Sequence, residues 1–476
     1  MNVASDILQR TPPELWLSIF EHATFVPHAF DTDVADPFDV PGAPIPFDTQ
    51  IEDNLRSSFA TKRSLVLVCK LWHDLAMPLL YQAVAARDNH SLKSLRDTLT
   101  QYENNSTAQR NHKIQVRRLD LSSWPADERE VTPDLPIGLF AHLPHLEIFC
   151  IWDHDRPAGS ATNNPRRRYF TIYEVYSIIH DLLDSPACKA SLRKCILSSP
   201  SVYMNSYNAL ATECRQLSCL LSPSHARGVA PETQIIPDSQ FLTALSIDSV
   251  CEGGPVGADM QPWSRPLASL RNVHITLFSL SNGRKVGMEA FFRIQGAHLR
   301  TVQLDMRYCA TSDCVEFYLG ILATYCPNLT YLIFIRESRQ ELWPPGAFPP
   351  TVTHLGVYTN TQVPPRGLSD HLELMHKLAA RGGKVPGVVR RLNALTEEEW
   401  KYLCRDADRH ALYLSMPLPP HCRLEDAGGK DVLSLLRESP VILEPASSQG
   451  TPAPKPLTLL RRISRRLPFF HHSPTA

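Results

Sequence analysis

The sequence has no excess of charge of either sign and no long apolar run. Its 48 Lys and Arg residues stand against 49 Asp and Glu residues, which leaves a net charge of −1. This balance gives no reason to expect nucleic acid or an anionic membrane surface as a partner. No apolar stretch approaches the roughly 18 residues of a membrane span, and the N-terminus lacks the features of a signal peptide. We therefore expect a soluble protein of the cytoplasm, the nucleus or both, with no membrane span.

Motifs that identify enzymes are missing as well. The sequence contains no G-x-S-x-G, H-E-x-x-H, Walker or dinucleotide fingerprint. Its 12 cysteines include no Cys-x-x-Cys pair, and no His cluster completes a zinc set. We therefore expect a non-enzyme with no catalytic, cofactor-binding or metal-binding residues and no cofactor. The cysteines are expected to be reduced and mostly buried.

What the chain does have is enough apolar residues to form a core. It is 476 residues long, with 43% apolar and 20% charged residues. Since domains usually take roughly 100–200 residues each, the length predicts more than one domain.

The N-terminal region carries two short apolar patterns of helical period. Pro12 and Pro13 suit a first helical turn, where a missing N–H costs nothing, and Thr11 can cap that turn. A second helix is expected to include residues 65–76 and to end at Pro78. The apolar positions that define the two faces are Leu15, Ile19, Phe20 and Ala23, and then Leu65, Val68, Cys69, Trp72 and Ala76.

These two segments resemble an F-box, the part by which a family of proteins docks onto a Skp-type adaptor of a ubiquitin ligase. The resemblance rests on Pro12-Pro-Glu-Leu15, on the Ile19-Phe20 pair and on Val68-Cys-Lys-Leu-Trp72. The family's opening Leu is replaced here by Thr11. The resemblance implies binding to the adaptor, and through it to a cullin scaffold. It implies contacts through Pro12, Pro13, Leu15, Trp16, Ile19, Phe20, Leu65, Val68, Cys69, Trp72, Leu80 and Tyr81.

An acidic insertion separates the two helices at residues 25–55. It contains five prolines, seven acidic residues and no Lys or Arg. A segment of this composition buries too little apolar surface to fold by itself, so we expect a disordered or extended loop facing solvent. An acidic docking loop is the alternative.

From residue 116 onward, a pattern of three apolar positions recurs eight times, with a ninth, weaker copy whose third position is Ser222. Successive first positions lie 23–30 residues apart, except for one gap of 46. Each copy predicts one strand, stacked in parallel on the next. The copies are Val116-Leu119-Leu121, Leu146-Phe149-Ile151, Leu192-Cys195-Leu197, Leu217-Leu220-Ser222, Leu242-Leu245-Ile247, Leu270-Val273-Ile275, Leu299-Val302-Leu304, Leu329-Leu332-Phe334 and Val352-Leu355-Val357.

This periodicity resembles leucine-rich repeats in a divergent form. The segment beginning Cys326-Pro-Asn-Leu is similar to the strand entry of a cysteine-containing repeat, whereas the Asn or Cys that closes the family's repeat is met only by Asn360. The expected fold class is α/β: an N-terminal helical F-box-like module, then an irregular leucine-rich-repeat solenoid of parallel strands and helices. A general α/β domain without a true repeat is the alternative.

The expected domains are the helical module at 5–85, the repeat domain at 113–360, a C-terminal helical cap at 361–438 and a disordered tail at 439–476. Within the cap, helices are expected at 368–381, 396–405 and 431–437. The tail contains Arg461-Arg-Ile-Ser464, which has the form that basophilic kinases prefer and makes Ser464 a candidate phosphorylation site.

Together these features resemble the large fungal F-box families. That resemblance implies a substrate-recognition adaptor of a Skp–cullin–F-box-type E3 ubiquitin ligase, with a target protein bound to the repeat domain. Two alternatives remain: a repeat-type interaction scaffold whose F-box no longer binds its adaptor, and a hydrolase on an α/β domain.

Overall fold

The fold is seen in a computed structural model of the chain. It describes residues 11–45, 50–86, 89–105, 114–122, 124–125, 138–152, 167–168, 172–197, 204–222, 240–248, 265–277, 282–307, 312–337, 348–360, 386–394, 397, 399–400, 411, 414–415 and 421–438.

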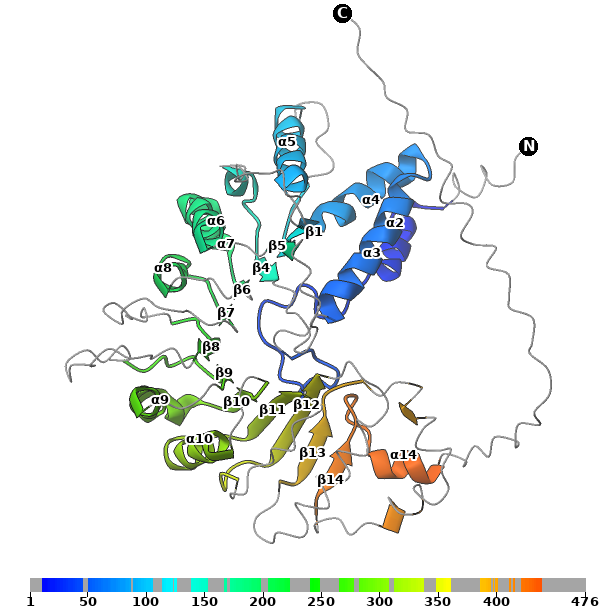
Figure 1. Cartoon of the computed structure of the whole chain (residues 1–476). Coiled ribbons are helices and arrows are strands. Elements are labelled where there is room, and N and C mark those ends of the chain that lie inside the picture. Colours follow the sequence, from blue (N-terminus) through cyan, green and yellow to red (C-terminus); the bar gives the residue numbers. More distant parts are fainter. Residues whose placement is uncertain are drawn as a thin grey trace, which may run out of the picture.

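Three helices form the N-terminal part of the described chain (Figure 1). They are α2 (Pro13–Ala23), α3 (Gln50–Val66) and α4 (Lys70–Gln82). The second helix of the sequence prediction is divided, because the chain leaves α3 after Val66 and starts α4 at Lys70. Pro78 does not end α4 as predicted but lies inside it, which removes one hydrogen-bond donor without stopping the helix.

A parallel sheet of 12 strands follows directly from α4. Each strand pairs with the next one along the chain, and a separate antiparallel pair joins β3 (Trp124–Pro125) to β5 (Arg167–Arg168). The sheet strands are β1 (Ala83–Ala86), β2 (Arg118–Ser122), β4 (Ile148–Trp152), β6 (Lys194–Leu197), β7 (Cys219–Leu221), β8 (Ala244–Asp248), β9 (Asn272–Thr276), β10 (Thr301–Asp305), β11 (Tyr331–Glu337), β12 (His354–Asn360), β13 (Val388–Arg391) and β14 (Arg423–Glu425).

Helices connect many of these strands and cover one face of the sheet, as parallel pairing requires. Figure 1 shows the sheet curved, with the helices along its outer side. They are α5 (Asn89–Asn105), η1 (Leu139–His142), α6 (Ile172–Asp184), α7 (Pro186–Ser191), α8 (Met204–Glu213), α9 (Asn282–Gln295), η2 (Gly296–His298) and α10 (Ser312–Tyr325), with α14 (Val432–Glu438) beside β14. The fold is therefore mixed α/β, as the sequence predicts.

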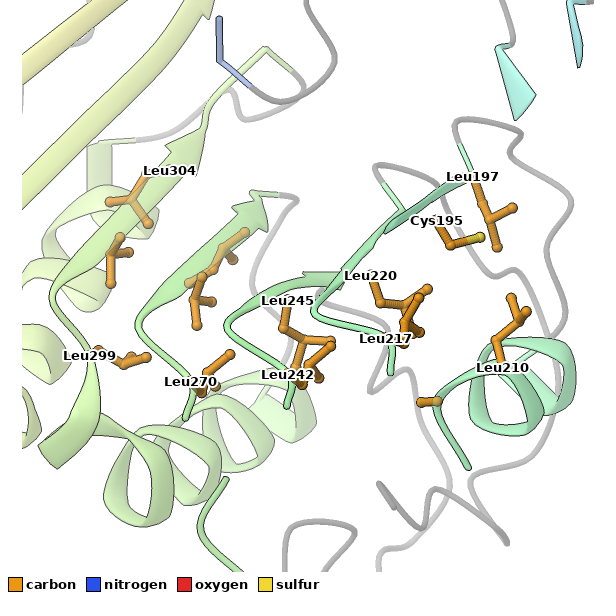
Figure 2. Close-up of a cluster of buried hydrophobic side chains, with 14 of the residues drawn as sticks. Cys195, Leu197, Leu210, Leu217, Leu220, Leu242, Leu245, Leu270, Leu299 and Leu304 are labelled. Atoms are coloured by element: carbon orange, nitrogen blue, oxygen red, sulfur yellow. The ribbon is translucent and has the colours of Figure 1, made fainter. Parts of the chain in front are cut away.

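The recurring apolar pattern accounts for the position of the strands. Each of the nine copies coincides with a strand, and its first apolar residue comes two positions before that strand begins. Alternate strand residues point to opposite faces, so Leu119 and Leu121 of β2 enter the core beneath the helices. Figure 2 shows the same arrangement for Leu242, Leu245 and Leu270, which line up between strands and helices.

The sheet continues beyond residue 360, where the sequence predicts a helical cap. Strands β13 and β14 lie in that segment, and their charged side chains conceal the strand pattern. The helix predicted at 431–437 is present as α14. The helix predicted at 368–381 and the tail with Ser464 lie outside the described residues, and only three positions of 396–405 are described.

The prediction for the insertion is wrong in two respects. Residues 50–55 belong to α3, whose Leu55 is buried although the helix has few apolar positions. Residues 28–45, which we call the strap, lie against the inner face of the sheet, and Phe38, Ala43 and Ile45 are buried there. Figure 1 shows this segment in blue inside the curve of the sheet.

Candidate docking surface on the N-terminal helices

An aromatic cluster holds α2 against α4. The rings of Trp16 and Phe20 lie with their centroids 4.9 Å and 4.8 Å from the ring of Trp72. Phe20 is only 1% exposed, so it is an interior residue of the module. This cluster fixes which faces of the two helices remain open to solvent.

Two hydrogen bonds fix the C-terminal end of α2, and one of them comes from α3. The hydroxyl of Thr24 donates to the carbonyl oxygen of Phe20 at 2.8 Å, and the hydroxyl of Ser58 donates to the carbonyl oxygen of Thr24 at 2.7 Å. Further along α3, burial lowers the pKa of Lys62 to about 8, and its ammonium lies 5.7 Å from the centre of the Phe59 ring. All three helices therefore pack as one unit.

Apolar side chains on the outer side of this unit are exposed. Leu15 and Ile19 on α2 are 56% and 51% exposed, and Val68 in the α3–α4 connection is 56% exposed. Leu67 and Leu71 are exposed beside Val68. Leu15 and Ile19 are one helical turn apart on α2, and Leu67, Val68 and Leu71 lie close together along the chain, so each group is an exposed apolar patch of the kind that often marks protein association. We call these five residues the docking surface.

The predicted adaptor contacts divide into three groups by exposure. Pro12, Pro13, Leu15, Ile19 and Val68 are exposed, and Trp16, Leu65, Cys69, Trp72, Leu80 and Tyr81 are half-buried. Phe20 is the exception, since its ring is used by the internal cluster and is not free to contact a partner. Tyr81 also packs against the core of the sheet.

Sequence reasoning missed Leu67 and Leu71. The helical spacing of Leu65, Val68 and Trp72 suggested one continuous helix, on which Leu67 would lie on another face. The break after Val66 turns Leu67 and Val68 outward together. The helix start was also placed slightly early, because Pro12 and not Thr11 is the N-cap of α2 and no side chain caps this end.

Two indole N–H groups beneath the docking surface have no hydrogen-bond acceptor within the described part of the chain. They belong to Trp16 and Trp72, and both nitrogen atoms are buried. An unsatisfied buried donor costs roughly 1–3 kcal/mol. The cluster is therefore held by ring packing and not by polar contacts.

A Ser-His-Asp array occurs on three neighbouring strands of the sheet. The imidazole Nδ1 of His274 lies 3.2 Å from the hydroxyl of Ser246, and its Nε2 lies 3.8 Å from a carboxylate oxygen of Asp305. All three residues are buried. The hydroxyl of Ser246 donates its only proton to the carbonyl oxygen of Ser222 at 2.7 Å, so the imidazole has no hydroxyl proton to accept. The array is a packed polar layer and not a nucleophile with access to substrate.

The thiols in the described part of the chain lack the exposure and the lowered pKa of reactive cysteines. The nine cysteines among the described residues are all free, and only Cys69 is not fully buried. Burial raises the pKa of Cys188 and Cys219 to about 11, which keeps these thiols protonated and unreactive. In the described ranges no group of three His, Cys, Asp or Glu side chains could hold a metal ion.

No helix in the described part of the chain is both long and apolar enough to cross a membrane. A scan against protein-family models matches no family, and a search of the curated proteins finds no match. Assignment of a function to this chain therefore depends on its own residues and their contacts.

Proposed function

We propose that this chain is the substrate-recognition subunit of a Skp–cullin–F-box-type ubiquitin ligase. In this proposal, α2–α4 form the F-box and bind the Skp-type adaptor, and the adaptor connects the chain to the cullin. The parallel sheet is a divergent leucine-rich-repeat solenoid that holds the target protein. The chain itself carries out no chemistry, and the protein acts in the cytoplasm or the nucleus.

One observation carries the proposal: Leu15, Ile19 and Val68 occupy positions of the F-box-like pattern and are exposed although they are apolar. A helical unit that served only to cap the sheet would be expected to turn such residues inward. Aliphatic and aromatic anchors of this kind dominate the energy of protein interfaces once they are buried by a partner.

The connection between the two parts also supports this function. Strand β1 begins at Ala83, directly after the last residue of α4, and pairs with β2. A rigid link of this kind holds a bound target at a fixed distance from the adaptor. Catalysis by the ligase would then depend on proximity, since a held lysine has a high effective concentration near the conjugating enzyme.

The proposal is tested by co-purification of the full chain with a Skp-type adaptor. The variant Leu15→Ala/Val68→Ala removes two exposed side chains without creating a core cavity. We expect capture to weaken at least tenfold, or about 1.4 kcal/mol. Val286→Ala on α9, which truncates an equally exposed apolar residue, is the matched control and should bind as the native chain does.

Failure of the native, folded chain to bind any Skp-type adaptor would contradict the proposal. The alternative, a repeat scaffold whose F-box no longer binds, predicts that outcome. The departure at Thr11 from the F-box pattern favours this alternative. Equal capture by the double variant would show that the docking surface is not the binding site.

A further inference from the structure

The strap crosses the inner face of the sheet along the beginnings of its strands. Most of its hydrogen-bond partners on the sheet are residues at or just before strand starts, from Arg118 of β2 to Tyr331 of β11, and Arg390 within β13 is a further one. Strands β2 and β11 are separated by seven steps in the sheet order. The segment from Ala29 to Asp39 makes these contacts with a turn at each end, since Asp31 N–H donates to His28 O and Val40 N–H donates to Asp36 O.

Most of the sheet's contacts are made to carbonyl oxygens of the strap. A guanidinium nitrogen of Arg118 donates to Ala29 O at 2.7 Å, and the ammonium of Lys194 donates to Asp31 O at 3.1 Å. The hydroxyl of Ser218 donates to Thr32 O at 3.1 Å, and the amide of Asn272 donates to Val34 O at 3.4 Å. Donors that meet backbone oxygens can bind an extended chain whatever its side chains are.

Side-chain recognition is concentrated at Asp36-Pro-Phe-Asp39. The ring of Phe38 lies 4.9 Å from the ring of Tyr331 and 5.2 Å from the guanidinium of Arg390, measured to ring centroids. The space for this ring depends on the absence of a side chain at Gly356. A Cβ atom there would lie 3.3 Å from Phe38 Cζ and 2.9 Å from Ile333 Cγ1. The inner face therefore contains a shaped site for one aromatic side chain.

The carboxylates of Asp36 and Asp39 flank this ring, and each accepts two hydrogen bonds. Asp39 accepts hydrogen bonds from Tyr331 at 2.8 Å and from Arg300 at 3.0 Å. Asp36 accepts from the hydroxyl of Thr301 and also from the backbone N–H of Phe38 at 3.0 Å. The second contact closes a short turn within Asp36–Asp39. The local sequence of these four residues therefore favours the conformation that they have on the sheet.

The middle of the strap is bound mainly through its backbone, since Lys194 and Ser218 donate to Asp31 O and Thr32 O there. A cavity lies between it and the sheet, lined on the strap side by Asp33 and Val34 and on the sheet side by Trp152, Ile196 and Leu221. Trp152 is buried, and its indole N–H has no hydrogen-bond acceptor among the described residues. The side chains of the strap therefore leave part of the inner face unfilled between Ala29 and the Phe38 site.

From these contacts we infer that the inner face is a peptide-binding groove and that the strap is its resident, exchangeable ligand. The occupant that replaces the strap is an acidic segment of a target protein, with an aromatic residue flanked by aspartates. This inference rests on the proposed function for the assignment of the incoming segment to a ligase target. The groove itself is argued from the strap alone.

The test uses the full chain and a fluorescent peptide with the sequence of the strap, residues 28–45. In the chain variant Phe38→Ala the tethered strap loses its aromatic anchor, which leaves the groove open to the peptide. An occupied groove weakens apparent binding by the fraction of molecules in which it is free. We expect the peptide to bind the Phe38→Ala chain at least tenfold more tightly than the native chain, by fluorescence anisotropy.

Two controls are matched to this design. Phe25→Ala removes the same type of side chain from a position just before the strap. Phe25 is 73% exposed whereas Phe38 is 8% exposed, so this chain should behave as the native one. A peptide with alanine in place of Phe38 should bind none of the chains. No binding to a folded Phe38→Ala chain, or equal binding to all three chains, would overturn the inference.

Hydrogen exchange on the native chain gives an answer even if the Phe38→Ala chain fails to fold. We expect excess peptide to speed the exchange of amides in the strap while those of β10–β12 are unchanged. Strap amides that exchange only together with these strands, with or without peptide, would make the strap a fixed part of the fold. Neither readout involves the adaptor. A negative result for the peptide therefore does not bear on adaptor binding, and a negative result for the adaptor does not bear on the groove.

Discussion

The N-terminal helices and the inner face of the sheet are both apolar, but only the helices leave their apolar residues uncovered. Leu15, Ile19 and Val68 are exposed to solvent, whereas Ile333, Ile335 and Trp152 on the inner face are buried with the strap packed against that face. Large exposed apolar faces invite unspecific association. The difference suggests that a partner can bind the helices directly, while a partner of the inner face must compete with a segment of the same chain.

Replacing Arg390, which binds the strap to the sheet, should cause the largest loss of stability. Its guanidinium donates to Glu425 at 2.5 Å and 2.9 Å and to Pro37 O at 2.5 Å, and both charged residues are buried. Arg390→Met leaves the Glu425 carboxylate without its buried partner. We expect a loss of about 3–5 kcal/mol in the free energy of unfolding, measured with urea.

Arg423→Met is the control for that experiment. Arg423 lies 3.7 Å from the other oxygen of the same carboxylate, but its side chain is exposed. Exposed ion pairs contribute at most about 1 kcal/mol. Equal losses for the two variants would show that the buried contact to the strap has no special weight.

Acid should weaken the inner face through His274. Burial lowers the pKa of this imidazole to about 4, although Asp305 opposes the shift, and Arg307 adds to it. The unfolded chain therefore takes up a proton near pH 6.5 that the folded chain does not accept until about pH 4. Stability from this group is complete above pH 6.5 and falls by about 3 kcal/mol as the pH approaches 4.

The variant His274→Gln should lose this part of the pH dependence, as seen by comparing the free energy of unfolding at pH 7 and pH 4. An unchanged pH profile in His274→Gln would mean that the imidazole is accessible to solvent.

The smallest change in stability is expected for substitutions on the docking surface. Ile19→Ala removes an exposed side chain, so the free energy of unfolding should change by no more than about 0.5 kcal/mol. Its neighbour Phe20 is buried, and Phe20→Ala should cost about 3–5 kcal/mol in the same thermal or urea assay. A large loss at Ile19 would show that this side chain is already buried by another part of the chain.

The sequence predicted the strands because the repeated pattern depends on local spacing. Leu299, Val302 and Leu304 mark β10 without reference to any distant residue, and the same holds for the other eight copies. The exposed residues of the docking surface were partly predicted for the same reason. Leu15, Ile19 and Val68 belong to a short pattern that can be read along the chain.

The strap could not be predicted, because its contacts are with residues distant in the sequence. Its prolines and aspartates have the composition of a solvated loop, and nothing near it shows that Arg118 or Lys194 would donate to its carbonyl groups. Strand β13 was missed for a related reason. Arg390 and Arg391 suggest a surface segment until their buried partners, Glu425 and Glu399, are known.

The length of chain between the two ends of the Phe38 site has a consequence for biosynthesis. Pro37 and its donor Arg390 are 353 residues apart. At roughly 5–20 residues per second, a ribosome needs about 20–70 s to make the second after the first. During that interval the strap cannot make its contacts with Arg390. The strands of the sheet are added one at a time, and the strap cannot yet cover their apolar inner face completely. Newly made copies of this protein should therefore depend on chaperones until translation has passed β13.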